Sequence, residues 1–456
     1  MHRFLVSASH KSSGKTTLAV GLAAALRRRA LSVQTFKKGP DYIDPLWLSL
    51  ASGEPCRNLD FHVAPREEIA AAFARHGAAA DACLVEGNKG LYDGLDLDGS
   101  NSNAALAKLL DLPVVLVIDA RGMTRGIAPL ILGYQAFDPD VRFAGVILNR
   151  LGGARHEAKL RAVIEHYTGV RVLGAVHEEP DIGIFERHLG LVPANEAPSA
   201  AARIEAIRAA VERQVDFDAL LRQTRTEHAL AAPAAKRPAA PSQPAVRIGV
   251  ARDRAFGFYY AGDLEALEDA GAELVPLDTL RDANLPEVDA LFIGGGFPEC
   301  FGAELEANAS LRGQIRQAIA RGMPVYAECG GLMYLARSIA WKGERREMVG
   351  AIGADVVMRE RPTGRGYVRL EETAAHPWPG GGEGREIRAH EFHYSSLEGL
   401  DPATPFAYRV RRGHGIDGER DGIVLGNVLA SYTHLRAAGG CDWPARFVGF
   451  VRRLAR

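Results

Sequence analysis

The sequence predicts an α/β protein whose first half forms a doubly wound parallel sheet and whose second half forms another α/β domain. Short apolar runs alternate with helical patterns in the first half, at residues 3–8, 82–85, 113–119, 143–149 and 171–176. The alternation resumes late in the chain, at residues 246–251, 290–294 and 323–327. Strands that alternate with helices typically pair in parallel, with helices covering both faces of the sheet.

A segment rich in alanine and proline separates the two halves. It reads HALAAPAAKRPAAPSQPAV over residues 228–246 and has few side chains that could pack into a core. This composition is typical of a semi-rigid tether. We therefore expect an N-terminal domain over residues 1–227, a linker over 228–245 and a C-terminal domain over 246–456.

The composition is that of an ordinary globular protein. The 456 residues are 47% hydrophobic and 24% charged, and a net charge of -1 gives no general attraction to nucleic acids or anionic membranes. The five cysteines are scattered without C-x-x-C spacing, which argues against disulfides and zinc. The first residues lack a signal-peptide core, and no apolar run approaches membrane-spanning length. We expect a cytoplasmic protein with a small-molecule partner, and the sequence leaves a homodimer open.

A phosphate-binding loop follows the first expected strand. Residues 9–16, SHKSSGKT, match G-x-x-x-x-G-K-[ST], except that Ser9 replaces the first glycine. Gly14 would let backbone N–H groups approach phosphates, Lys15 would reach their β and γ oxygens, and Thr16 would ligate magnesium. A chance G-K-T-T in an ordinary loop is the alternative. The predicted nucleotide-binding residues are Ser13, Gly14, Lys15, Thr16 and Thr17.

Acidic residues follow further expected strands. Glu86 ends one apolar run, and Asp93 lies in the glycine-rich loop after it. The segment KKGPDYIDP, residues 37–45, brings Asp41 and Asp44 after another strand. Each acid alone could be a cap or a turn residue. Together they predict a ligand site, because parallel sheets bind ligands at the carboxyl ends of their strands.

A candidate nucleophile, Cys329, lies within MPVYAECGGLMYL, residues 323–335. An apolar run precedes it, and Gly330 and Gly331 permit a sharp turn into a helical pattern. At such an elbow the helix N-terminus favours a thiolate, and backbone N–H groups can hold an oxyanion. A buried structural cysteine is the alternative from this stretch alone. A partner base has to decide between them.

Several short motifs follow one another along the chain in an order that is characteristic of one family. They are SSGKTT (12–17), FKKGPDYIDP (36–45), EGNKGLYDG (86–94), ERHLGLVPANE (186–196), GGGFPE (294–299), YAECGGLMYL (326–335), HEFHYS (390–395) and SYTHLR (431–436). Together they resemble the cobyrinic acid a,c-diamide synthase family, glutamine-hydrolysing tetrapyrrole a,c-diamide synthases that use ATP. The resemblance implies an N-terminal synthetase domain with a P-loop-type, dethiobiotin-synthetase-like sheet. It also implies a C-terminal class I glutamine amidotransferase domain.

The resemblance implies a glutaminase centre at the elbow. Cys329 would attack the glutamine carboxamide and release ammonia, and His434 would act as general base and acid. The backbone of Gly295 and Gly296 would supply the oxyanion hole. Histidines 390 and 393 compete with His434, and the resemblance favours His434.

Two departures from the wider class I pattern concern this centre. The usual elbow reads Gly-x-Cys-x-Gly, whereas Ala327 stands two positions before the cysteine here. The usual histidine is followed by Pro-Glu, whereas Leu435 and Arg436 follow this one. The orienting glutamate is therefore missing from its expected place, and the sequence names no third member of the catalytic group.

For the N-terminal domain, the resemblance implies that ATP phosphorylates a peripheral carboxylate and that ammonia then displaces the phosphate. The cofactor would be Mg2+, with ATP and glutamine as co-substrates. The sequence does not distinguish ATP from GTP, because Asn149 is the one candidate for contacting the nucleobase. The implied metal ligands are Thr16, Asp44 and Glu86. The implied substrate residues are Asp41, Tyr42, Ile43 and Asp93.

The implied substrate is cobyrinate or hydrogenobyrinate, amidated on its a and c acetate groups in cobalamin biosynthesis. The loop after Glu86 departs from the common pattern: Asn88 and Lys89 replace an apolar pair, and residues 99–103 read GSNSN. This polar loop resembles that of a branch of the family that amidates sirohydrochlorin or sirohaem, which is the alternative substrate. Sequence drift in a surface loop explains the departure equally well.

Two alternatives to an enzyme of this family belong to other function classes. Partitioning-type regulatory ATPases share a deviant phosphate loop, but they have a lysine where this chain has His10, and they lack a glutaminase domain. A tetrapyrrole-binding protein with two degenerate sites is the other class. The intact Cys329, His434 and G-K-T sequence argue against it.

Overall fold

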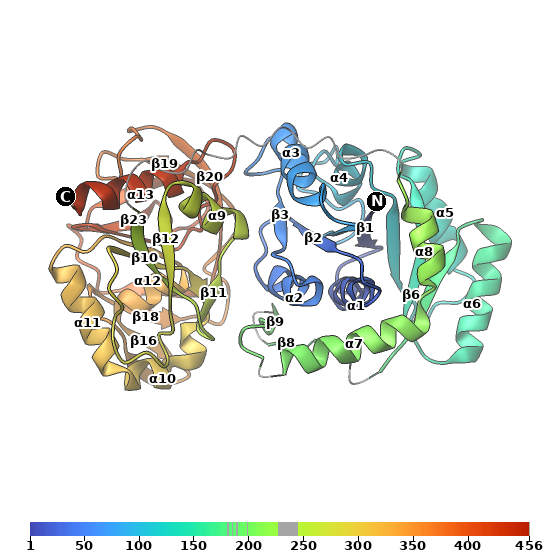
Figure 1. The fold of residues 1–456 in the computed structure, drawn as a ribbon, viewed down its shortest axis with the longest axis horizontal. Helices are drawn as coiled ribbons and strands as arrows, with labels where there is room; N and C mark the ends of the chain where they lie inside the picture. The colour runs from blue at the N-terminus through green and yellow to red at the C-terminus, as the bar shows by residue number, and fades with distance from the viewer. Residues whose placement is uncertain (180–181, 185, 188–189, 198, 227–244, 456) are drawn as a thin grey trace. The chain divides into compact units, whose positions relative to one another are not determined.

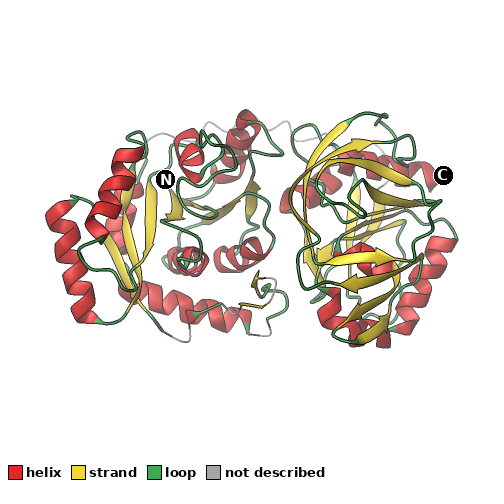
Figure 2. Cartoon of the chain, turned by 180° about the vertical axis from the view of Figure 1, so that it is seen from behind, coloured by secondary structure: helices red, strands yellow, loops and turns green. Residues whose placement is uncertain are grey.

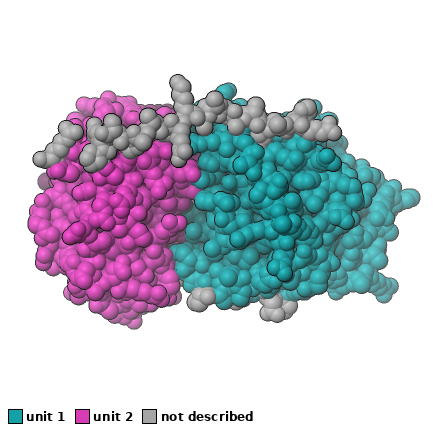
Figure 3. All heavy atoms as spheres, viewed as in Figure 1, with its two compact units in different colours: residues 1–235 teal, residues 236–456 magenta. Residues whose placement is uncertain are grey.

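The computed structural model describes residues 1–179, 182–184, 186–187, 190–197, 199–226 and 245–455. The chain divides into two compact units, Met1–Ala235 and Lys236–Arg456 (Figure 3). The expected linker at 228–245 lies outside the described residues except for its last position, so the domain boundaries stay a prediction. Two positions of the ERHLGLVPANE motif, 188 and 189, also lie outside them.

The first unit contains a seven-stranded parallel sheet in the order β3-β2-β4-β1-β5-β6-β7. The strands are β1 (His2–Ala8), β2 (Val33–Lys38), β3 (Arg57–Leu59), β4 (Ala82–Glu86), β5 (Val114–Asp119), β6 (Phe143–Leu151) and β7 (Val172–His177), with a short pair β8 (Glu186–Arg187) and β9 (Gly190–Leu191) outside the sheet. The chain first winds to one side of β1 and then to the other. This confirms the predicted doubly wound parallel sheet.

Helices cover both faces of this sheet (Figure 1). They are α1 (Lys15–Arg28), α2 (Ile43–Ser52), α3 (Arg66–Gly77), α4 (Asn103–Leu109), α5 (Ile127–Phe137), α6 (Ala154–Tyr167), α7 (Ala200–Gln214) and α8 (Phe217–Thr224). Helices α1, α2, α7 and α8 share one apolar cluster, and α3 to α6 share the other. Strand β1 feeds both clusters because its side chains alternate: Phe4 and Val6 pack in the first and Leu5 in the second. Burial on both faces explains why its sequence is continuously apolar.

The second unit contains a nine-stranded mixed sheet in the order β12-β10-β13-β15-β24-β23-β22-β19-β20. Its parallel half consists of β10 (Val246–Ala251), β12 (Ala272–Leu277), β13 (Ala290–Ile293), β15 (Val325–Glu328) and β24 (Val428–Ser431). Its antiparallel half consists of β19 (Gly364–Glu372), β20 (Glu386–His393), β22 (Phe406–Arg412) and β23 (Arg420–Leu425). Three of the parallel strands, β10, β13 and β15, match the apolar runs expected at residues 246–251, 290–294 and 323–327.

Smaller elements complete the second unit, and helices flank its strands (Figure 2). A four-stranded sheet contains β16 (Ala336–Trp341), β17 (Glu344–Glu347), β18 (Ile352–Met358) and β21 (Ser395–Glu398), and β11 (Phe256–Phe258) pairs with β14 (Gly295–Gly296). The helices are α9 (Ala261–Asp269), α10 (Gly302–Ala307), α11 (Ala309–Ala320), α12 (Gly330–Leu335) and α13 (Trp443–Leu454), with a 3-10 turn at Pro298–Phe301.

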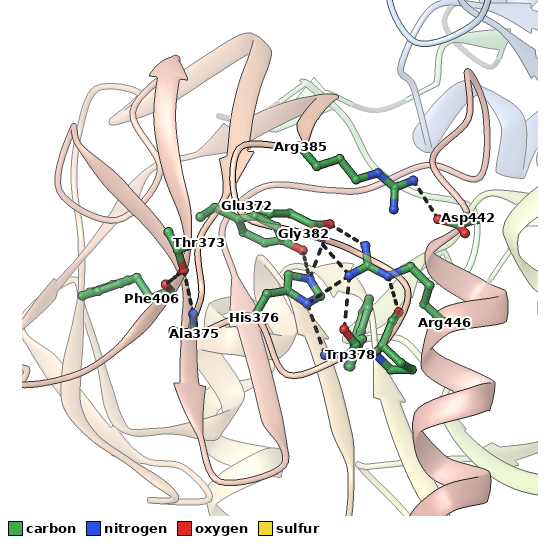
Figure 4. Close-up of polar contacts among 12 residues, drawn as sticks. Glu372, Thr373, Ala375, His376, Trp378, Gly382, Arg385, Phe406, Asp442 and Arg446 are labelled. Carbon is green, nitrogen blue, oxygen red and sulfur yellow. Dashed lines mark hydrogen bonds and ion pairs between the residues drawn. The ribbon is translucent and has the colours of Figure 1, made fainter.

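A buried ion pair fastens the last helix to the antiparallel half of the sheet (Figure 4). The guanidinium of Arg446, on α13, contacts both carboxylate oxygens of Glu372, at the end of β19. His376 lies against the same guanidinium, 3.3 Å from Nδ1 to Nη2, and its Nε2 is 3.1 Å from the Tyr408 hydroxyl. Burial lowers the pKa of His376 to about 4, so this ring is neutral and the ion pair is not crowded by a third charge.

Candidate active sites

The phosphate loop of the first unit joins β1 to α1. Gly14 has a φ of 87°, and a side chain there would lie 2.2 Å from Nδ2 of Asn149, so only glycine fits without displacing that amide. Asn149 donates a hydrogen bond to the Ser13 carbonyl at 2.9 Å, and Arg150 donates to the Ser12 carbonyl at 2.8 Å. The end of β6 therefore shapes the loop, and the N-terminus of α1 faces the space where a phosphate would bind.

Charged side chains converge beside this loop. The Thr16 hydroxyl donates to Glu86 at 2.7 Å and lies 3.2 Å from Asp44. Lys37 lies among the carboxylates, with Nζ 2.5 Å from Asp44, 3.1 Å from Glu86 and 3.8 Å from Asp41. Strands β1, β2 and β4 are neighbours in the sheet, so the residues at their carboxyl ends meet at one edge.

The cluster holds more charge than a buried site usually tolerates. Burial raises the pKa of Glu86 to about 7 against the opposing attraction of Lys37. Burial also lowers the pKa of Lys15 to about 8, and repulsion from Lys37 adds to the lowering. Burial opposes the charge of Lys37 itself, but Asp44 and Glu86 outweigh it and raise its pKa. Bound phosphates and cations would rebalance these charges.

The oxygens at this edge suit magnesium. No group of three or more His, Cys, Asp or Glu side chains among the described residues could hold a metal by itself. Magnesium, however, usually takes one or two carboxylates and completes its shell with water and substrate phosphates. Thr16, Asp44 and Glu86 supply such oxygens, and Oε2 of Glu86 is buried without a hydrogen-bond partner in the described part of the chain. The residues present therefore fit the ion.

The four expected substrate residues lie in two loops at the same edge of the sheet. Asp41 accepts the backbone N–H of Asp44 at 3.1 Å, where α2 begins, and Tyr42 is the residue just before that helix. Asp93 accepts the backbone N–H of Gly90 at 2.8 Å. Ile43 is partly buried and packs against the apolar cluster under α1 and α2. Both acids thus shape their own loops, and contact with a substrate stays a prediction.

The loop after β4 is fixed by a buried asparagine. The Asn103 amide donates to the carbonyls of Asn88 and Gly90 at 2.6 and 2.7 Å, and its oxygen accepts the Asn88 backbone N–H at 3.1 Å. The Asn88 side chain in turn accepts from Lys38 at 3.1 Å. Lys89 has a φ of 49°, a backbone conformation that is uncommon outside glycine. The polar pair at 88–89 is therefore part of an ordered loop.

The elbow of the second unit holds Cys329 between β15 and α12. Cys329 has φ 48° and ψ -102°, a strained conformation that costs about 1–3 kcal/mol and recurs at functional sites. A side chain at Gly331 would lie 2.0 Å from the Ile293 carbonyl oxygen, and one at Gly330 would lie 2.9 Å from the Gly296 nitrogen. The two glycines thus let the elbow pack directly on the backbone that follows β13.

That backbone is the predicted oxyanion segment. Gly296 is fixed by close packing, because a side chain there would meet the Ala255 carbonyl oxygen at 1.9 Å. The Tyr259 hydroxyl accepts the Gly294 N–H at 2.9 Å and donates to the Ala251 carbonyl at 2.5 Å. Tyrosine and glycines together hold the segment rigidly beside Cys329, as a preorganised donor site requires.

His434 follows β24 and lies beside the elbow. Its backbone N–H donates to the His390 carbonyl at 2.8 Å, and the two rings stack with centroids 4.9 Å apart. Nδ1 of His434 is 3.4 Å from Oε2 of Glu328. Burial opposes protonation of His434, but the neighbouring Cys329 and Glu328 outweigh it and raise its pKa to about 10. The structure thus brings together Cys329 and His434, which the sequence paired as nucleophile and base, and those roles stay a prediction.

The competing histidines make other contacts. His390 lies with Nδ1 3.3 Å from the Tyr260 hydroxyl. His393 stacks on Tyr432 with centroids 3.9 Å apart, and its Nδ1 is 3.0 Å from the Ser395 carbonyl. The buried Glu328 was not singled out by the sequence reasoning. The sequence feature that could have pointed to Glu328 is an acidic residue at the end of an apolar strand, directly before the cysteine.

Comparison with protein families identifies both units. A model of the CobQ/CobB/MinD/ParA nucleotide binding domain matches residues 5–191, and a model of the CobB/CobQ-like glutamine amidotransferase domain matches residues 247–440. A nucleotide-binding domain joined to a glutamine amidotransferase domain defines the class of protein: a glutamine-dependent ligase. The class I amidotransferase prediction for the second unit is confirmed.

Relatives of known name narrow the class to one family. Cobyrinate a,c-diamide synthase from Magnetococcus marinus is 46% identical, over 99% of this chain and 97% of the relative. Those from Methanosarcina acetivorans and Methanothermobacter thermautotrophicus are 43% and 41% identical, covering 95% and 98% of this chain and 92% and 98% of the relatives. The chain therefore belongs to the cobyrinate a,c-diamide synthase family, whose members are ligases of cobalamin biosynthesis.

The tight packing at the elbow predicts a strong effect of one added methyl group. Gly331→Ala should lower glutamine hydrolysis about 100-fold, because the elbow must move off the Ile293 carbonyl and misplace the nucleophile. Glutamate release by purified protein of verified fold measures this. Gly353→Ala is the matched control, since a side chain at that site would meet nothing within 4 Å. Equal activity of both variants would contradict the packing argument.

Proposed function

We propose that the enzyme uses ATP and glutamine to amidate the a and c acetate groups of cobyrinate or hydrogenobyrinate, through an acyl phosphate at each carboxylate. The observation that carries the proposal is the pairing of His434 with Cys329 at a strained elbow, in a chain whose other unit holds a phosphate loop beside clustered acids. The names of the relatives support the substrate.

The second unit would release ammonia from glutamine. The Cys329 thiol first gives its proton to His434, the thiolate then attacks the carboxamide carbon, and the N–H groups of Gly295 and Gly296 stabilise the oxyanion. His434 then gives the proton to the leaving nitrogen, so ammonia departs and a glutamyl thioester remains. Water hydrolyses the thioester to glutamate and restores the thiol. One hard hydrolysis is thereby divided into two easier steps.

The first unit would activate the tetrapyrrole carboxylate. A carboxylate oxygen attacks the γ-phosphorus of ATP, ADP departs, and ammonia attacks the acyl carbon and displaces phosphate to give the amide. Lys15 and the backbone from Ser13 to Thr17 would hold the phosphates. Magnesium, held by Thr16, Asp44 and Glu86, would neutralise phosphate charge. Such chemistry depends on alignment and charge neutralisation more than on a protein nucleophile.

The substrate would bind at the same edge of the sheet, near Asp41, Tyr42, Ile43 and Asp93. Sirohydrochlorin or sirohaem remains the alternative substrate, and the ordered contact of Lys38 with Asn88 is the observation that favours it. A partitioning-type ATPase is not supported, because the chain carries a glutamine amidotransferase domain.

We also propose that the enzyme acts in the cytoplasm on a small molecule, without a nucleic acid or membrane partner. None of the helices in the described ranges has the length and apolarity to cross a membrane. All five cysteines are free thiols, as a reducing compartment would keep them. A homodimer is compatible with the proposal and is not required by it.

The division of labour between the units predicts a split phenotype. Cys329→Ser should lower glutamine-dependent amidation about 1,000-fold or more, because the nucleophile is lost, and should leave ammonia-dependent amidation intact. Product formation with each nitrogen source measures this. Cys441→Ser, which changes another free cysteine of the same unit, is the control and should retain both activities. Glutamine-dependent product from the Cys329→Ser enzyme at the wild-type rate would refute the assigned nucleophile.

The substrate assignment predicts which tetrapyrrole gains amides. With ATP, magnesium and glutamine, cobyrinic and hydrogenobyrinic acids should each gain an amide at both the a and c positions, and sirohydrochlorin should gain none. Mass spectrometry of the end products distinguishes these results, because each amidation lowers the product mass by a fixed amount. Amidation of sirohydrochlorin alone would instead establish the alternative substrate and would point to the polar loop at 88–89 as its cause.

A further inference from the structure

A fully buried acid, Glu328, lies directly before the proposed nucleophile. It is the last residue of β15, and the parallel register pairs it with Ser431 on β24. Only 3% of its surface is exposed, and the strand before it is buried throughout. A buried carboxylate is costly unless donors surround it. Its partners therefore indicate why the fold keeps it.

The Glu328 carboxylate is oriented independently of His434. Its Oε1 accepts the backbone N–H of Leu435 at 2.9 Å and the hydroxyl of Tyr326. Burial, followed by the charge of Glu328, raises the pKa of Tyr326 well above its usual value, so this hydroxyl stays protonated and donates. These two donors fix Oε1, and Oε2 is left 3.4 Å from Nδ1 of His434.

We propose that Glu328 is the positioning residue of the glutaminase centre: its carboxylate accepts a hydrogen bond from the Nδ1–H of His434 and thereby holds the other ring nitrogen toward Cys329. This inference rests on the proposed roles of Cys329 and His434. An acid in this position performs the task that the missing glutamate after the histidine would have performed. It comes from the strand that carries the nucleophile, so one elbow positions both the thiol and its base.

The chemistry of the step requires such a partner. Imidazole can take the thiol proton at one nitrogen only if the other already carries a proton, and an acceptor at Nδ1 selects that tautomer. When the ring becomes an imidazolium, the negative charge of Glu328 stabilises it. The titratable groups that face His434 in the described structure are Glu328 from β15, Cys329 from the elbow and His390 from β20, with Tyr260 contacting His390.

Two readouts test the proposal. Glu328→Gln keeps the size of the side chain and removes its charge; we expect kcat for glutamine hydrolysis to fall about 100-fold, while KM for glutamine stays near the wild-type value. Magnetic resonance of isotope-labelled histidine, with the His434 signal assigned from a His434→Asn variant, reports the second readout. The pKa of His434 should fall, because the imidazolium loses a neighbouring negative charge.

Matched variants separate positioning from folding. Glu328→Asp keeps the charge and should recover part of the His434 pKa and of kcat. Glu372→Gln removes an equally buried acid of the same unit, the partner of Arg446 in Figure 4, and should leave the His434 pKa unchanged even where it lowers stability. Wild-type kcat together with an unchanged His434 pKa in Glu328→Gln would overturn the proposal.

Failure of the underlying catalytic pair gives a different result. If Cys329→Ser or His434→Asn still hydrolysed glutamine at the wild-type rate, the assigned nucleophile or base would be wrong, and the role of Glu328 would fall with it. If both variants are inactive and only Glu328→Gln behaves as wild type, the pair stands and the positioning role alone is refuted.

Discussion

Parallel strand pairing is the constraint on which both sites depend. Neighbouring parallel strands end at the same edge of a sheet, so residues far apart in the sequence meet there without a dedicated scaffold. In the first unit this edge gathers the phosphate loop after β1, Lys37 of β2 and Glu86 of β4. In the second it gathers the glycine segment after β13, the elbow after β15 and His434 after β24.

The two edges manage buried charge differently. The first concentrates three carboxylates around Lys37, with Lys15 beside them, and burial raises the pKa of Glu86 to about 7 against the attraction of Lys37. Such a site gains from a polyphosphate and a divalent cation, which supply charges of both signs. The second edge holds one acid, Glu328, beside His434, whose pKa is raised to about 10, so this ring carries a positive charge at neutral pH.

Much of the first unit could be predicted from the sequence. Its strands are buried on both faces, so they read as continuous apolar runs, and the run at 82–85 lies within the observed Ala82–Glu86. The phosphate loop is a local pattern and needs no long-range information. The antiparallel half of the nine-stranded sheet was missed because strands such as β19, GRGYVRLEE, and β22, FAYRVRR, carry exposed polar side chains among their buried ones. Their pairing depends on partners far along the chain.

The acid beside His434 could not be predicted for a related reason. Glu328 and His434 are brought together by the register of β15 with β24, and no short motif encodes the register of strands about a hundred residues apart. The backbone contacts of Asp41 and Asp93 were also hidden, because a loop-shaping acid and a substrate-binding acid look alike in the sequence. The roles of both acids remain predictions.

The most direct test of the account follows oxygen rather than nitrogen. Cobyrinic acid whose acetate carboxylates carry heavy oxygen would be converted with ATP, magnesium and glutamine, and the released inorganic phosphate analysed by mass spectrometry. If the first unit forms an acyl phosphate, each amide formed transfers one labelled oxygen to phosphate. Amide product accompanied by unlabelled phosphate would contradict carboxylate activation by ATP, and with it the central role given to the phosphate loop.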